Sequence, residues 1–331
     1  MDPSMAAHGR VTDEIRAYRT YTGESAQTAR WIQPSHRTSI PSATGDQMRL
    51  EAEILDHLTF SREWSLHPFS ISRVRPQRDA LVLDVDERIA AFGETDDAAT
   101  DVLRRLVPSV DAGDGSFVTG VAGLRLGLIQ GRSLELRMAD TSAVVVLRCA
   151  PHARWRASVD TVHADLQELG QRPLWDAGAG VGDIERDYIG WQLRSFPEFG
   201  WLGSALLRRL YLFHSTSQAF YTKGWSSFGQ FRFELNSTTT AGAYHRRFVD
   251  RLTDTRLGIP LVVKDIDCYC DSAGSARSAT CWIELGPPSG HKSILQLRFC
   301  HNPQPRTIGF RPDFKNLDAD RRWLDRVLPP A

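Results

Sequence analysis

Two groups of short β-rich segments, separated by segments with helical periodicity, set the strongest limit on how this chain can fold. The first group comprises three predicted strands, Phe117–Gln130, Ser133–Met138 and Ser142–Arg148. The second group lies towards the C-terminus and comprises Leu261–Cys270, Ser278–Leu285 and Ser293–Cys300. Polar or glycine-containing turns separate strands of the first group, as expected for an antiparallel meander. We therefore expect antiparallel sheets in both halves of the chain.

Helical segments accompany both groups of strands. Met48, Ala52 and Leu55 recur at helical spacing, and Val162 and Leu166 do so in a second segment that ends at a glycine. A third segment, rich in aromatic residues, extends from about residue 188 to 222, and a fourth begins near residue 239. Helices that pack on antiparallel sheets make an α+β fold, which is the class that the sequence predicts.

The same pattern predicts two lobes and an N-terminal tail. The glycine- and alanine-rich stretch Asp176–Gly182 divides an α+β lobe at residues 44–175 from an aromatic-rich α+β lobe at residues 183–331. Residues 1–43 contain few large apolar side chains and many Ser, Thr and Gln residues, so we expect a flexible, disordered tail. Such a tail offers a docking arm for protein partners.

Charge and cysteine content limit the function. The 331 residues carry 40 basic and 40 acidic side chains, so any surface for nucleic acid must be local. Apolar runs are too short to span a membrane, and the first ten residues lack a secretory core. Five cysteines are too few and too uneven for a secreted disulfide framework, so we expect a cytoplasmic protein without membrane contact.

Three cysteines in the second group of strands form a candidate metal site. Cys268 and Cys270 are two residues apart and share one face of a strand, and Cys281 lies on the next strand. Cys300, beside His301, has the parity opposite to the apolar residues of its strand. Thiolates are preferred ligands of Zn²⁺, and packing of small apolar thiols in the core is the alternative.

Two carboxylates at the end of a β-rich run form a second candidate site. Asp84 and Asp86 are separated by one residue, and such pairs can hold Mg²⁺ for phosphoryl-transfer or hydrolytic chemistry. An enzyme built on these two residues is one alternative function. Solvated acids at a strand end are the structural alternative, and the sequence leaves open whether the protein is an enzyme.

Aromatic and basic residues alternate most densely between residues 188 and 248. Unpaired bases stack on aromatic rings, while Arg and Lys contact phosphates. The leading hypothesis is therefore an accessory protein that binds or processes DNA or RNA with the second lobe. The residues assigned to this surface are Lys223, Trp225, Phe228, Arg232, Arg246 and Arg247. Aromatic core packing is the alternative interpretation, and a structural or assembly subunit is the third functional hypothesis.

Overall fold

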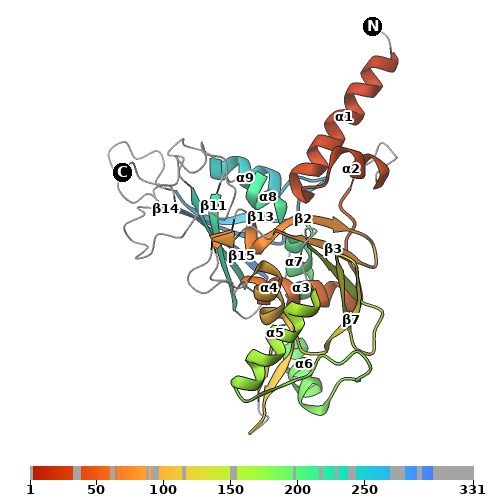
Figure 1. Ribbon diagram of the computed structural model, residues 1–331. Helices are drawn as coiled ribbons and strands as arrows, with labels where there is room; N and C mark the ends of the chain where they lie inside the picture. The colour runs from red at the N-terminus through yellow and green to blue at the C-terminus, as the bar shows by residue number, and fades with distance from the viewer. Residues whose placement is uncertain are drawn as a thin grey trace, which may run out of the picture.

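The fold is of the expected α+β class, with helices packed on mostly antiparallel sheets (Figure 1). A computed structural model describes residues 3–32, 39–59, 64–65, 67–86, 89–90, 97–113, 117–149, 155–196, 199–215, 219–227, 230–237, 244–268, 280–288 and 293–300. None of the described helices has the length and apolar character that crossing a bilayer requires.

The first large sheet has the strand order β2–β3–β9–β8–β7. Its strands are β2 (Ile71–Pro76), β3 (Leu81–Val85), β7 (Leu124–Gln130), β8 (Ser133–Met138) and β9 (Val144–Arg148). Every neighbouring pair is antiparallel except β3 and β9, which are parallel with Leu81 opposite Val145. Alternate side chains such as Leu83 and Leu147 are fully buried, which explains the two-residue periodicity of these segments.

Helices and two small sheets complete this half of the chain. The helices α4 (Ala98–Leu106) and α5 (Trp155–Glu168) pack against each other, and the Asp97 carboxylate caps α4 by accepting from the Thr100 amide. The small sheets are β10–β5–β6 and the pair β1–β4. Their strands are β1 (Trp64–Ser65), β4 (Ile89–Ala90), β5 (Ser109–Asp111), β6 (Val118–Thr119) and β10 (Gln171–Pro173).

The second large sheet has the order β11–β12–β15–β14–β13. Its strands are β11 (Ala219–Ser227), β12 (Gln230–Ser237), β13 (Val262–Asp267), β14 (Thr280–Gly286) and β15 (Ile294–Cys300). The last three match the predicted strands closely, whereas β11 begins inside the segment that aromatic density led us to expect as helical. β12 and β15 are parallel, and the other neighbours are antiparallel.

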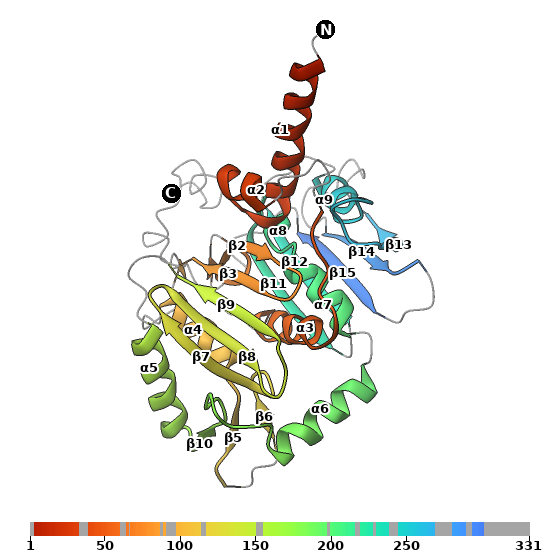
Figure 2. The ribbon, with the colours of Figure 1, turned by 90° about the vertical axis from the view of Figure 1, so that its right-hand side faces the viewer.

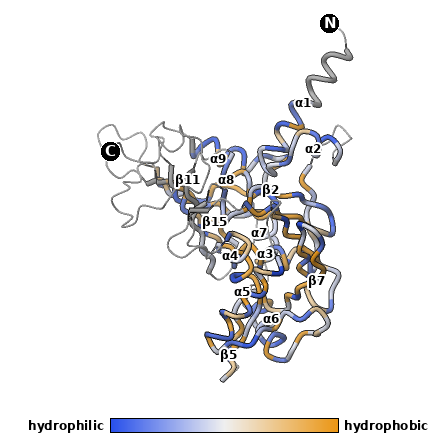
Figure 3. The backbone as a smooth tube through the Cα atoms, in the orientation of Figure 1, coloured by the Kyte–Doolittle hydropathy of each residue, from blue (hydrophilic) through white to orange (hydrophobic). Residues whose placement is uncertain are grey.

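Aromatic rings fill the space between this sheet and its helices. The helices are α7 (Phe199–Leu207), α8 (Tyr211–Ser215) and α9 (Tyr244–Leu252). Phe213 of α8 lies 4.9 Å from Phe233 of β12, and Phe248 of α9 lies 5.7 Å from Phe299 of β15, between ring centres. One face of the sheet is therefore the core of the second lobe. Hydrophobic stretches of the chain also lie around α3 (Gly45–Thr59) and β7 (Figure 3).

The helix α3 lies with α7 between the two large sheets (Figure 2). A Cβ atom added at Gly203 of α7 would lie 2.6 Å from the Cβ of Ala52, so only glycine permits this approach. Glu51 of α3 is fully buried and accepts from Arg208 Nε and Nη2 and from the Ser204 hydroxyl. Arg208 also donates to the Pro41 and Gln77 carbonyls.

Residues 12–31 of the predicted N-terminal tail pack against other parts of the fold, where Glu24 pairs with Arg75. Helices α1 (Pro3–Thr22) and α2 (Ala26–Ile32) bury Tyr18, Tyr21 and Ala29. The Tyr21 hydroxyl donates to the Arg251 carbonyl at 2.7 Å. Buried side chains such as Tyr18 and Tyr21 anchor this segment although it contains few large apolar residues.

Removal of the Glu51 carboxylate should destabilise the whole chain. Glu51→Ala leaves the fully buried Arg208 guanidinium without its counter-ion, so we expect a loss of about 3–5 kcal/mol in the free energy of unfolding. Urea denaturation would measure it, with Glu168→Ala on exposed α5 as control. A loss below about 1 kcal/mol would contradict this role.

Asp56, also on α3, should make stability depend on pH. Burial, and secondarily the nearby Glu53 carboxylate, raises the pKa of Asp56 from 3.8 to about 7, and its carboxylate accepts from the Ser226 hydroxyl. Since the folded state holds the proton more tightly than the unfolded chain, the free energy of unfolding should decrease as pH rises from about 4 to about 7. Asp56→Asn should flatten this decline in urea denaturation, whereas Asp160→Asn on exposed α5 should preserve it. An unchanged profile in Asp56→Asn would contradict the assignment.

Candidate metal centre

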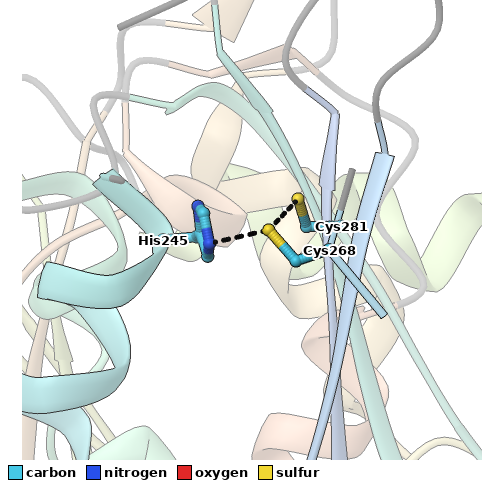
Figure 4. A group of neighbouring side chains, drawn as sticks. All are labelled: His245, Cys268 and Cys281. Atoms are coloured by element: carbon cyan, nitrogen blue, oxygen red, sulfur yellow. Dashed lines mark hydrogen bonds between the residues drawn. The ribbon is translucent and has the colours of Figure 1, made fainter. Parts of the chain in front are cut away.

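His245, Cys268 and Cys281 converge where the first turn of α9 meets the outer strands of the second large sheet (Figure 4). Asp267, the last residue of β13, pairs with Trp282 of β14, so Cys268 comes next to Cys281 across the two strands. The two Sγ atoms lie 3.3 Å apart, and Cys268 Sγ lies 3.4 Å from His245 Nε2. One ligand atom from each residue falls within 4.8 Å of the other two.

The surroundings of this cluster are apolar. His245 and Cys281 are fully buried, and Cys268 is half-buried. The His245 ring lies 5.8 Å from the Phe299 ring, between centres. Both cysteines are free thiols rather than a disulfide. A site of low dielectric strengthens the attraction between thiolates and a cation.

The donor set fits Zn²⁺. Zinc takes thiolate sulfur at about 2.3 Å and imidazole nitrogen at about 2.0–2.1 Å, so neighbouring ligand atoms of a tetrahedron lie roughly 3.5–3.8 Å apart. The measured separations of 3.3 and 3.4 Å are close to these values. Mg²⁺ prefers oxygen ligands and does not suit sulfur donors. Three protein ligands leave one tetrahedral position for a further ligand.

The structure brings together two of the three predicted cysteine ligands and adds a histidine. Cys270 lies outside the described residues, as does His301. The sequence analysis missed His245, which lies on the apolar face of α9 with Phe248, Val249 and Leu252 at helical spacing. A histidine on such a face was the available signal, but only the tertiary fold shows that it points at the cysteines.

The residues predicted to bind nucleic acid do not share one surface. Arg246 and Arg247 are exposed on α9, which packs on the inner face of the sheet. Trp225 and Arg232 pair across β11 and β12, where they alternate with inward residues such as Phe231 and so lie on the outer face. Lys223 occupies the β11 position opposite Glu234, and Phe228 lies outside the described residues. Among the described side chains, Arg246 and Arg247 therefore lie on the opposite side of the sheet from Trp225 and Arg232.

Asp84 and Asp86 are engaged by different partners. Arg148 Nε and Nη2 donate to the two Asp84 carboxylate oxygens at 2.6 and 2.9 Å. The Asp86 carboxylate lies 2.6 Å from His67 Nδ1, and both residues are nearly buried. One carboxylate thus pairs with a guanidinium and the other with an imidazole, and a shared Mg²⁺ site at this pair stays a prediction.

Comparison with known proteins assigns neither a family nor a function to the chain. The chain matches no protein-family model, no curated protein and no solved structure. The function is therefore inferred from the arrangement of the residues of this chain.

Proposed function

We propose that this chain is a zinc-binding protein in which His245, Cys268 and Cys281 hold the metal. The convergence of three buried or half-buried soft donors from separate elements carries the proposal. Thiolate and imidazole donors at these separations favour Zn²⁺ over Mg²⁺.

The metal would have a structural role and stabilise the edge of the second large sheet. All six residues of β13 are exposed, so this strand has little apolar anchorage of its own. Cys268 directly follows β13, and His245 stands in the first turn of α9. A metal bound by both residues would tie the edge strand to the helix that covers the sheet.

Metal analysis of substituted proteins tests this proposal. Protein purified under reducing, zinc-replete conditions should contain about one zinc ion per chain. Cys281→Ser should lose most of it, because the hydroxyl is a much poorer zinc ligand than the thiolate. The matched control is Cys149→Ser, which changes a buried free cysteine in the other lobe and should retain full occupancy.

The substitution His245→Cys separates ligation from packing. It keeps a zinc ligand and should retain metal, whereas His245→Phe keeps an aromatic ring and should lose it. Wild-type protein without zinc, or Cys281→Ser with full zinc content, would contradict the proposal. Elemental analysis of the folded proteins, confirmed folded by circular dichroism, gives the readout.

A basic helix surface supports nucleic-acid binding as a second candidate function. Arg246, Arg247 and Arg251 are exposed on α9, and the first of them follows the metal ligand His245 directly. A metal that orders the start of α9 would therefore also position these guanidinium groups. We accordingly narrow the proposed surface for DNA or RNA to α9, with Arg246 and Arg247 contacting phosphates.

Oligonucleotide binding at several salt concentrations tests this second candidate. Arg246→Ala/Arg247→Ala should weaken binding of single strands and reduce the magnitude of the log–log salt slope by about 1.4, at roughly 0.7 per phosphate contact. The control Arg137→Ala/Arg186→Ala removes two exposed arginines that lie outside α9 and should leave the slope unchanged. Equal slopes in both double variants would remove α9 as the binding surface.

A further inference from the structure

A pocket of about 300 Å³ lies between α1 and the end of α9, in the second lobe. Arg16 comes from α1, Arg251 from the last turn of α9, and Arg256 from the turn that follows. Tyr21 and Leu257, both nearly buried, form its apolar wall. Its volume is at the lower end of the range for small-molecule sites.

The walls of the pocket are held in place by contacts over long sequence separations. The Tyr21 hydroxyl donates to the Arg251 carbonyl at 2.7 Å, and Arg256 Nη1 lies 3.2 Å from Glu14 Oε1. The Asp254 carboxylate accepts from the amides of Arg256 and Leu257 at 3.0 and 2.7 Å. These contacts fix the turn against α1, so the backbone positions of Arg251 and Arg256 are fixed relative to that helix.

Three arginines line the pocket beside the carboxylates of Asp13 and Asp254. A third carboxylate, that of Glu14, pairs with Arg256, so these charges balance. Arg16 Nη1 contacts Asp13 at 2.9 Å on the exposed side of α1, and both side chains remain more than two-thirds exposed. An exposed ion pair of this kind contributes little, so Arg16 can also contact an anion in the pocket.

A buried guanidinium behind the wall gives the site its excess of positive charge. Arg209 is only 7% exposed, and its Nε donates to the Leu257 carbonyl at 2.6 Å. Its Nη1 donates to the Ala205 carbonyl at 3.1 Å, and no carboxylate of the described residues forms an ion pair with it. Burial lowers the pKa of Arg209 to about 10, with Tyr21 opposing this shift and the neighbouring Arg208 charge contributing to it. A buried cation that lacks a counter-ion is costly, so it favours an anion nearby.

We propose that this pocket binds the terminal phosphate of a small phosphomonoester. Planar guanidinium groups from α1 and α9 match the oxygens of phosphate, and the charge on Arg209 behind the wall favours a dianion over a single carboxylate. The ligand would be of nucleotide or sugar-phosphate size. The same chemistry also fits the 5′-phosphate at the end of a nucleic-acid strand. This site does not depend on the metal centre.

Calorimetry with defined probes tests the pocket. Inorganic phosphate and adenosine 5′-monophosphate should bind to the full chain, and adenosine should not. Arg16→Gln should weaken both interactions about tenfold through loss of a charge-assisted contact. The control Arg137→Gln removes an equally exposed arginine of the first lobe and should bind as wild type does.

A second variant reports on the buried charge. Phosphate should raise the melting temperature of the wild type but not that of Arg209→Met. If Arg209→Met does not fold, the surface variant Arg16→Gln provides the test. Binding of 5′-phosphorylated oligonucleotide without binding of the monophosphate would identify a strand end as the source of the phosphate. No phosphate-dependent binding by the wild type, or unchanged binding by Arg16→Gln, would overturn the proposal.

Discussion

The buried ion pair between Glu51 and Arg208 is the interaction on which the arrangement of the two large sheets depends. Glu51 lies in the middle of α3, and Arg208 follows α7, so the pair joins the helices that separate the two large sheets. The same guanidinium donates to carbonyls before α3 and in the β2–β3 turn. The Ser204 hydroxyl and all three guanidinium nitrogens of Arg208 have acceptors, close to where Gly203 of α7 approaches Ala52 of α3.

Buried arginines of this protein connect separate segments of the chain through hydrogen bonds and ion pairs. Arg125 donates to the Ala179 and Gly180 carbonyls and pairs with the buried Glu185, which fixes the glycine-rich stretch expected as a domain break. Arg208 and Arg209 use backbone carbonyls in the same way. The arginine-rich composition is thus partly structural. Arg209 differs from Arg125 and Arg208 because its charge meets no carboxylate among the described residues, which is why its surroundings favour an anion.

The sequence allowed prediction of elements whose side chains alternate regularly. β8, β9, β14 and β15 follow from residues such as Leu134, Leu147 and Leu297, which are buried at every second position. The β11–β12 hairpin was missed because its aromatic residues concealed a two-residue period. Tyr21 docks against a carbonyl 230 residues away, so its low-complexity surroundings gave no sign of that contact. Likewise strand parity brought Cys268 and Cys281 together, but the approach of His245 depends on how α9 packs on Phe299.

X-ray absorption at the zinc edge tests the metal centre most directly. The account predicts two sulfur scatterers at about 2.3 Å and at least one imidazole nitrogen at about 2.0–2.1 Å in protein purified with zinc. His245→Cys should add a third sulfur, and Cys149→Ser should leave the spectrum unchanged. A first shell of oxygen and nitrogen without sulfur, or a Cys268–Cys281 disulfide in metal-free protein, would contradict the assignment.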